Sequence, residues 1–275
     1  MTKTTTTTTA TMGAAAIARA AARLLAAQQR STPCAPVRDL IGSDDIAAAY
    51  AVQTQIVEHF VALGRRLVGR KVGLTSSAVQ KQLGVDQPDF GVLFEDMDCS
   101  SGLPIEVTRL LQPKVEAEIA FVLSGDIDAA VTAQSVRRYV ECAAAALEIV
   151  DSRIAGWDIT LGDTIADNAS SGLYALGDVV PAGGLPDLAA VTMSMTENGE
   201  VVSNGIGAAC LGSPWEALAW LANTSREVGD PLKAGEVVLS GALGPMVPVT
   251  AGSTYTATIS GIGLVESSFT AGAHA

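Results

Sequence analysis

The chain has 275 residues, of which 48% are hydrophobic, and it carries a formal net charge of −12. This length and composition allow a substantial core, in one large domain or two smaller ones. The chain has no basic footprint for a nucleic-acid partner and no run of about 18 apolar residues for a membrane-spanning helix, so we expect neither partner.

Residue types that serve zinc sites and catalytic triads are sparse. The four cysteines are scattered without a C-x-x-C pair, which predicts reduced thiols in a cytoplasmic protein. The two histidines, His59 and His274, are too few for a multi-histidine zinc site. A Ser-His-Asp triad would depend on His59, which lies in a helical pattern and is predicted to have a structural or solvated role.

The N-terminal quarter of the chain reads as helical. Residues 1–12 form a threonine-rich tract without a hydrophobic pattern, and we expect a disordered tail there. Residues 13–275 are expected to form one catalytic domain, with a helical part over 13–66 and a β-rich core over 67–275. Within the helical part, we expect one helix over 14–30. A second, over 46–62, begins after the capping signal Ser43-Asp44-Asp45 and ends at Gly64.

Two candidate proton-transfer residues follow. Residues 67–74 read as a partly buried strand that contains Lys71. Burial lowers the pKa of a lysine and so favours proton exchange near neutrality, although an exposed cation is the alternative. Asp89 lies in the turn signal Gln87-Pro88-Asp89-Phe90-Gly91, where it could serve only to form the turn.

A cluster of acids is the main chemical signal. Residues 113–123 alternate as a strand does, so Glu116 and Glu118 project from one face. Paired carboxylates repel unless a cation lies between them, and their oxygens suit Mg²⁺, Mn²⁺ or Ca²⁺. Glu148, in an apolar run, would complete a three-carboxylate site. The alternatives are a solvent-facing strand edge for the first two and an ion pair with Arg153 for Glu148.

The rest of the chain mixes helix and strand signals. We expect a helix over 135–146, a polar segment over 162–172, a hairpin at Asn198-Gly199 and a helix over 214–228 that starts with Ser213 as N-cap. Strands follow over 236–242, 255–259 and 264–269. The polar segment is either a loop or part of the lining of a substrate pocket. The glycine spacing fits neither a dinucleotide fingerprint nor a phosphate-binding loop, so we expect no nucleotide cofactor.

Several motifs in a fixed order resemble one enzyme family. They are P-K-V-E-A-E-I-A from Pro113, A-L-E-I-V-D-S-R from Ala146, A-D-N-A-S-S-G from Ala166, G-R-K-V-G-L-T-S from Gly69, Q-P-D-F-G from Gln87 and S-G-A-L-G-P-M-V from Ser240. From about Ala14 to the C-terminus, the chain resembles the hydratase branch of the fumarylacetoacetate hydrolase superfamily.

The resemblance implies a fold, a cofactor and a reaction. The fold is α+β, with a mixed, strongly twisted, barrel-like sheet and flanking helices. Glu116, Glu118 and Glu148 would hold Mg²⁺ or Mn²⁺, and Lys71 and Asp89 would move protons or activate water. Candidate substrate-binding residues are Asp167, Asn168, Ser170 and Ser240.

The implied reaction is hydration of 2-hydroxypenta-2,4-dienoate, a small anion, to 4-hydroxy-2-oxopentanoate in meta-cleavage degradation of aromatic compounds. The resemblance also implies a homo-oligomer, with enzymes of neighbouring steps as candidate partners. A related 4-oxalocrotonate-type decarboxylase, a C–C bond hydrolase and a non-catalytic binding subunit are the alternatives. The hydrolases of the family typically use a histidine to activate water, and only His59 is available.

Overall fold

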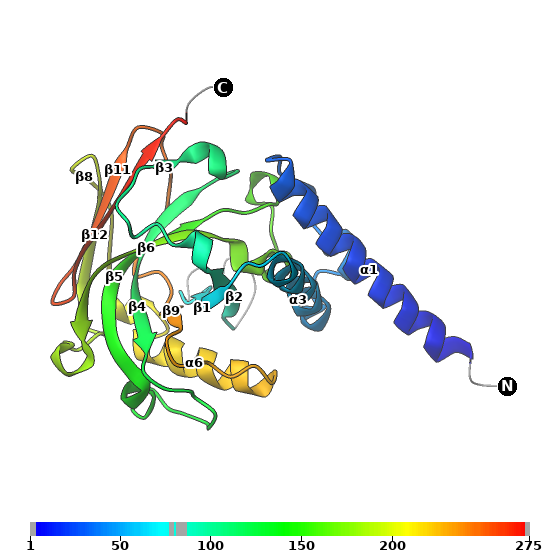
Figure 1. Ribbon diagram of the computed structural model, residues 1–275, viewed down its shortest axis with the longest axis horizontal. Coiled ribbons are helices and arrows are strands. Elements are labelled where there is room, and N and C mark those ends of the chain that lie inside the picture. Colours follow the sequence, from blue (N-terminus) through cyan, green and yellow to red (C-terminus); the bar gives the residue numbers. More distant parts are fainter. Residues whose placement is uncertain (1–3, 77–79, 81–86, 273–275) are drawn as a thin grey trace.

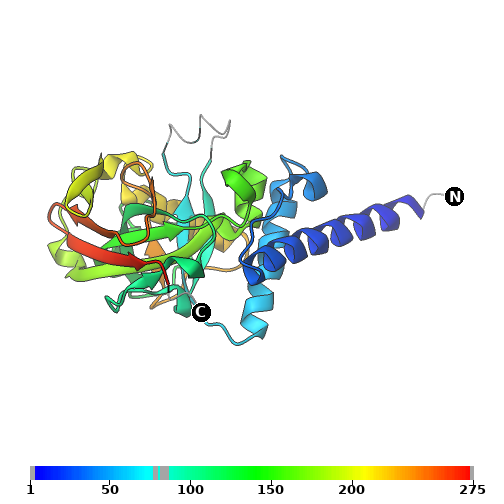
Figure 2. The ribbon, with the colours of Figure 1, turned by 90° about the horizontal axis from the view of Figure 1, so that it is seen from above.

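Three helices precede the first strand. The computed structural model describes residues 4–76, 80 and 87–272, with only the backbone for residues 4–12. Helices α1 (Thr4–Gln29), α2 (Arg38–Ile41) and α3 (Ile46–Ala62) pack together beside the β-structure, and α1 projects from the body (Figures 1 and 2). Helix α3 has the predicted bounds, with Asp45 as its N-cap and Gly64, at a φ of +90°, just beyond its end.

Helix α1 is longer than the sequence predicts. Its backbone is helical from Thr4, whereas we expected a disordered tail up to residue 12. Once the alanine-rich segment from Gly13 has formed a helix, each further residue adds one hydrogen bond without a new nucleation step, so threonines of moderate propensity can extend it. The boundaries between tail, helical part and core stay predictions.

The larger of two sheets has seven strands and carries the predicted acids. Its hydrogen-bonded order is β2-β1-β9-β4-β5-β6, with β10 paired to β4. The strands are β1 (Leu67–Gly73), β2 (Asp89–Phe94), β4 (Lys114–Leu123), β5 (Val140–Val150), β6 (Ser171–Pro181), β9 (Val237–Leu239) and β10 (Val247–Pro248).

The mixed, twisted sheet with flanking helices confirms the predicted fold class, but the sheet is not a closed barrel. Among the described residues, the outer strands β2 and β6 form no ladder with each other. Instead, Asn168, just before β6, accepts from the Val92 N–H (2.8 Å) and donates to the Val92 carbonyl (3.0 Å) on β2. One amide side chain thus occupies the edge of β2 where a closing strand would pair.

The helix predicted over 135–146 is wrong. Only a short 3₁₀ turn, Val136–Tyr139, precedes β5, and the alanines at 143–146 lie in that strand. Strand β5 is paired along nearly its whole length with β4 on one side and with β6 on the other. Pairing on both edges outweighs the helix propensity of alanine, which amounts to a few tenths of a kcal/mol per residue over most other residues.

The second sheet has five strands in the order β3-β12-β11-β7-β8. Its strands are β3 (Ile105–Glu106), β7 (Thr192–Glu197), β8 (Glu200–Ile206), β11 (Thr254–Ile259) and β12 (Gly263–Thr270). The predicted hairpin is confirmed, because Asn198 (φ +52°) and Gly199 (φ +87°) connect β7 to β8. Strands β11 and β12 contact β5 and β6 of the larger sheet.

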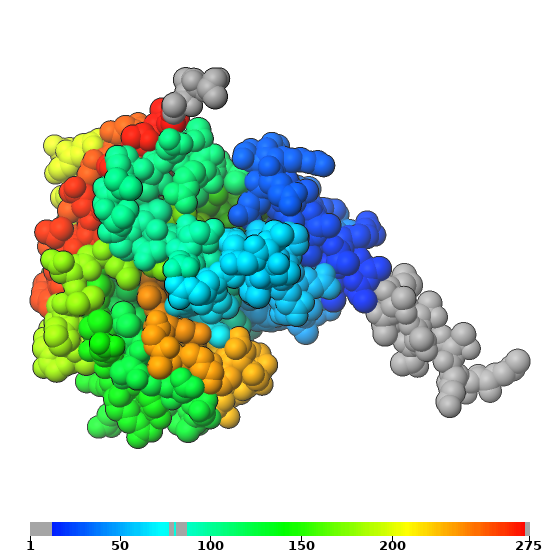
Figure 3. Space-filling model, viewed as in Figure 1, coloured from blue at the N-terminus to red at the C-terminus, as the bar shows by residue number. Residues whose placement is uncertain are grey.

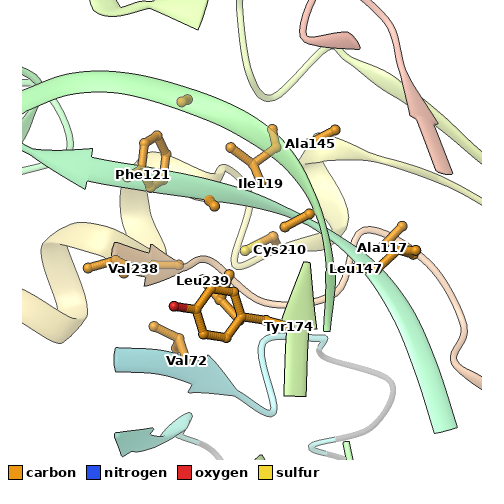
Figure 4. Close-up of a cluster of buried hydrophobic side chains, with 14 of the residues drawn as sticks. Val72, Ala117, Ile119, Phe121, Ala145, Leu147, Tyr174, Cys210, Val238 and Leu239 are labelled. Carbon is orange, nitrogen blue, oxygen red and sulfur yellow. The ribbon is translucent and has the colours of Figure 1, made fainter. Parts of the chain in front are cut away.

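Alternation along the strands separates an apolar face from the face with the acids. Ile119 and Phe121 of β4 join Ala145 and Leu147 of β5 in a buried cluster (Figure 4). Phe121 packs on Trp215 of helix α6 (Pro214–Glu227), whose N-cap is Ser213 as predicted. The intervening residues, Glu116 and Glu118 among them, project to the opposite face.

One buried carboxylate contributes several of the hydrogen bonds that attach the N-terminal helices to the rest of the protein. Asp163, in helix α5 (Leu161–Ala166), accepts from the backbone N–H groups of Val37 and Arg38 at 2.9 Å and from the Arg38 guanidinium at 2.8 Å. Its side chain is fully buried, whereas Asp158, a second partner of Arg38, is 68% exposed. No helix among the described residues has the length and hydropathy to cross a membrane.

We therefore predict that Asp163→Ala lowers the free energy of unfolding by about 3–5 kcal/mol, because it removes the buried partner of Arg38 and leaves two backbone N–H groups without an acceptor. The matched control, Asp158→Ala, removes an exposed partner of the same arginine and should cost about 0.2–1 kcal/mol. Chemical denaturation of both variants measures the difference. Equal losses would show that Asp163 does not attach the helices.

Candidate metal centre and active site

Three glutamates meet on the inner face of the larger sheet. Glu116 of β4 lies directly opposite Glu148 of β5, and Glu118 follows two residues along β4. One oxygen from each carboxylate lies within 4.8 Å of the others. Glu118 and Glu148 are buried and Glu116 is half-buried. The strand register alone therefore brings together the three acids that the sequence predicts.

The carboxylates have fewer hydrogen-bond partners than buried acids need. Glu118 Oε2 accepts from the Gly241 N–H at 2.8 Å, but Glu118 Oε1 and both Glu148 oxygens accept no hydrogen bond from any described residue. Burial and mutual repulsion raise the pKa of Glu116 to about 7 and that of Glu118 well above its usual range. Unpartnered, mutually repelling oxygens at this spacing fit a divalent cation.

Lys71 supplies the positive charge in direct contact with the cluster. Its Nζ lies 3.2 Å from Glu148 Oε1 and donates to the Ala169 carbonyl at 2.9 Å. The alternative of an ion pair between Glu148 and Arg153 is not what the structure shows, because Glu148 pairs with Lys71 and Arg153 pairs with Asp167. The expected fall in the lysine pKa is also wrong in direction. Burial does lower this pKa, but Glu148, Asp89 and the other two glutamates together raise it.

The side chains of Asp89 and Lys71 lie next to each other in the space beside Gly73. It is paired with Gly73 across β1 and β2, and a Cβ on Gly73 would lie 2.1 Å from Asp89 Oδ1 and 3.4 Å from Lys71 Nζ. Gly73 therefore leaves the space in which the two side chains converge. No described residue donates a hydrogen bond to either Asp89 oxygen, and burial raises the pKa of this acid. Asp89 is a buried, unpartnered acid beside a cation.

A strained turn presents the carbonyl that Lys71 uses. Asn168, Ala169 and Ser170 all have φ between 50° and 55°, a left-handed conformation that non-glycine residues rarely adopt in succession. Asp167 anchors the turn through an ion pair with Arg153 Nε at 2.6 Å. Asn168 anchors it through Val92, as described above.

The four candidate substrate-binding residues differ in whether they line the cavity beside the glutamates. Asp167 and Asn168 are buried, and their polar atoms are used by Arg153 and Val92. The Ser240 side chain is buried, and its carbonyl accepts from Cys210 Sγ. Of the four, Ser170 alone lines the cavity that holds Lys71 and Asp89. The arrangement thus brings Ser170 to the candidate site and gives the other three packing partners within the protein.

The cavity beside the cluster measures about 240 Å³. Lys71, Asp89 and Glu116 lie along it, with apolar walls formed by Leu74, Val150, Ile159, Ala242 and Met246. Another cavity, beside α1 and α3, lies around Arg65 and Arg153 and contains none of the three glutamates. His59 lines neither cavity, which agrees with its predicted structural role.

Sequence reasoning did not single out four residues of the site, although Thr164 lies in the polar segment that it named as a possible lining of the pocket. Thr164 lines the cavity, and Gly241, at a φ of +106°, donates its N–H to Glu118. Lys114 and Trp157 lie at the cavity wall with the ammonium 4.2 Å from the ring centroid. The alternation that indicated Glu116 and Glu118 could have indicated Lys114 too, since it precedes them on the same face. The other three depend on contacts between distant segments.

Comparisons with known proteins agree on one family. Residues 58–270 match the family described as Fumarylacetoacetate (FAA) hydrolase C-terminal. A "TodF product hydratase" of Pseudomonas putida F1 is 52% identical over 90% of this chain and 92% of its own. A "2-keto-4-pentenoate hydratase" of Paraburkholderia xenovorans is 51% identical over the same shares.

A solved structure extends the likeness to three dimensions. The 4-oxalocrotonate decarboxylase from Pseudomonas putida G7, complexed with magnesium and adipate, superposes with a TM-score of 0.88 at 31% identity. The match covers 92% of this chain and 97% of that one. The family match, the two sequence relatives and this structure each cover most of the chain, so the chain belongs to the fumarylacetoacetate hydrolase family.

Proposed function

We propose that the protein is a divalent-metal-dependent hydratase. It adds water to 2-hydroxypenta-2,4-dienoate and gives 4-hydroxy-2-oxopentanoate, a step in the meta-cleavage degradation of aromatic compounds. The two relatives with 51–52% sequence identity to this chain are named as hydratases. A third, 41% identical, is named "2-hydroxyhexa-2,4-dienoate hydratase". The match spans more than nine-tenths of the length of each relative.

The observation that carries the proposal is a cluster of three carboxylates in which Glu118 Oε1 and Glu148 Oε2 have no partner among the described residues. Glu148 Oε1 has only the Lys71 ammonium. We propose that these three residues hold Mg²⁺ or Mn²⁺, which prefer oxygen ligands. When bound, the cation supplies Lewis-acid stabilisation of the negative charge that develops on the C2 oxygen of the substrate.

Lys71 and Asp89 are the proposed proton carriers. Hydration needs a proton delivered at C5, to give the conjugated 2-oxo-3-enoate, then water at C4 and a proton at C3. Neighbouring acids keep Lys71 protonated, so Nζ can donate. Asp89, with both oxygens free, can accept a proton from water and return it. When a cation neutralises the three glutamates, burial weighs more on Lys71 and Nζ releases its proton more readily.

Other groups around the cavity would orient the reactants. Thr164 and Ser170 place two hydroxyls 3.4 Å apart, and both residues line the cavity with Asp89. We propose that they position the attacking water. Leu74 and Ile159 limit the entry of bulk water to the apolar part of the cavity. Such enclosure strengthens the electrostatic effects within the site.

The related decarboxylase is the second candidate function, because the superposed structure with the TM-score of 0.88 carries that name. The hydratase relatives have much higher identity, 51–52% against 31%. A histidine-dependent C–C hydrolase is less well supported, since His59 lines neither cavity described above.

Assembly and location are also proposals. We propose a homo-oligomer in the cytoplasm, with enzymes of neighbouring steps as candidate partners. The exposed side chains of Val179, Val201 and Leu264, on β6, β8 and β12, offer apolar surface for contact between copies.

The direct test supplies freshly generated 2-hydroxypentadienoate with and without Mg²⁺ or Mn²⁺. We expect dienol absorbance to disappear only with metal, with 4-hydroxy-2-oxopentanoate as the product. In parallel, 4-oxalocrotonate should yield little CO₂. Rapid CO₂ release from 4-oxalocrotonate without hydration of the dienoate would favour the decarboxylase, and no reaction with either compound would reject both.

Glu118→Gln should abolish hydration while leaving the fold intact, because one charge and one ligand are lost from the cluster. We expect Mn²⁺ affinity, followed by electron paramagnetic resonance, to fall more than about 100-fold, beyond the loss usual for an outer-sphere partner. The matched control is Glu236→Gln, a buried glutamate paired with Arg70 outside the cluster, which should keep its Mn²⁺ affinity. Normal Mn²⁺ binding by Glu118→Gln would refute the metal assignment.

Lys71→Met should lower kcat by about 10²–10⁴-fold, the usual contribution of a proton-transfer group. Mn²⁺ should bind no more weakly, because the substitution removes a cation next to Glu148. The exposed lysine of the Lys233–Asp126 pair provides the control Lys233→Met, for which kcat should not change. A Lys71→Met enzyme that lost Mn²⁺ but turned over normally at saturating metal would assign Lys71 a structural role.

A further inference from the structure

Lys114 is the first of three charged residues in a row on one face of β4. Because side chains alternate along a strand, Lys114, Glu116 and Glu118 project to the same side. Exposure falls along this row: Lys114 and Glu116 are half-buried, whereas Glu118 is fully buried. Lys114 therefore lies at the more exposed end of this row, toward the mouth of the cavity, and Glu118 lies at its buried end.

The strand register places Lys71 at the opposite end of this row. Lys71 is level with Leu239 on β9, and Leu239 is level with Ala120 on β4, two residues beyond Glu118. Ala120 lies six positions beyond Lys114 on β4. The two lysines of the cavity thus bracket the carboxylates, one from the deep end and one from the mouth.

A tryptophan holds Lys114 in its place. The Lys114 ammonium lies 4.2 Å from the centroid of the Trp157 ring, a cation–π contact. Trp157 Nε1 donates to the Gln112 carbonyl at 3.1 Å, two residues before Lys114. Trp157 has a φ of +57°, an uncommon conformation for a bulky residue. The backbone is thus held in a strained conformation at the residue whose ring contacts Lys114.

Lys114 differs from Lys71 in having no acid as a close partner. Lys71 is paired with Glu148, whereas Lys114 forms no ion pair with any described residue. These two lysines are the only cations among the described residues that line this cavity. In a chain with a net charge of −12, an unpaired ammonium beside a cavity is a ready partner for an anion.

We infer that Lys114 binds the carboxylate of the substrate at the mouth of the cavity and directs the rest of the molecule inward, toward Lys71 and Asp89. The inference rests on the proposed function for the identity of this anion. It places the carbons that take up protons beside the two proposed proton carriers.

The same arrangement restricts the substrate class. A carboxylate at the deep end would meet Asp89 and a lysine already paired with Glu148. The inner walls are formed by apolar residues such as Leu74 and Ile159. The geometry therefore favours 2-oxo acids with one carboxylate and an uncharged far end over dicarboxylates.

A binding experiment tests whether Lys114 recognises the carboxylate, independently of catalytic turnover. The probes are 2-oxopentanoate and its uncharged analogue 2-oxopentanamide, titrated calorimetrically into Mn²⁺-loaded protein. We expect wild-type protein to prefer the acid by about 10–100-fold, the usual size of a charge-assisted hydrogen bond. Lys114→Met keeps the apolar stem against Trp157 and should remove this preference, whereas Lys114→Arg should retain most of it.

Lys114→Met should also bind Mn²⁺ at least as tightly as wild type, since it removes a cation near Glu116. A Lys114→Met protein that still preferred the acid, or that lost Mn²⁺ instead, would overturn the inference, and melting curves check that the variant folds. Wild-type protein that failed to hydrate the dienoate, yet showed an acid preference dependent on Lys114, would refute the proposed function and leave this inference standing.

Discussion

Mutual repulsion among three buried carboxylates is the constraint around which the rest of the site is arranged. Glu116, Glu118 and Glu148 are held together by the β4–β5 register, so they cannot separate without breaking a central pair of strands. Charges this close in a low-dielectric interior must be neutralised by cations, hydrogen-bonded or protonated. The protein supplies one ammonium, from Lys71, and one backbone N–H, from Gly241. We propose that a divalent cation neutralises the negative charge that these two groups leave uncompensated.

The hydrogen-bond network that holds Lys71 in place links two of the sequence motifs, the one that contains Glu148 and the one that contains Asp167. Arg153, from the motif that contains Glu148, binds Asp167 and also donates to the Asp151 and Ser171 carbonyls. Asp151 in turn accepts from the N–H groups just before β4. One arginine thereby connects the β5 end, the left-handed turn and the start of the glutamate strand. Such fully satisfied networks fix a geometry more effectively than apolar packing alone.

Local signals predicted the elements whose conformation is decided locally. The capping residues of α3 and α6, the Asn198-Gly199 turn and the alternation that pairs Glu116 with Glu118 depend on neighbours a few residues apart. The direction of the Lys71 pKa shift could not be predicted this way, because it depends on acids from three other strands that the curvature of the sheet brings near it. Nor could the open edge between β2 and β6, which depends on a single amide 76 residues from its partner.

The helix wrongly predicted over 135–146 rests on alanines of β5 that lie on the same face as the glutamates. On the inner face, Ala146 lies opposite Glu118, and Ala144 lies opposite Ala120. Larger side chains at these positions would crowd the glutamates on the same face, so we propose that the small residues there leave room for a cation. Alanine is the smallest residue that avoids the backbone freedom of glycine, yet it is also the strongest helix former. The sequence thus departs from strand propensity where the functional site needs space, and pairing with β4 and β6 compensates for that departure.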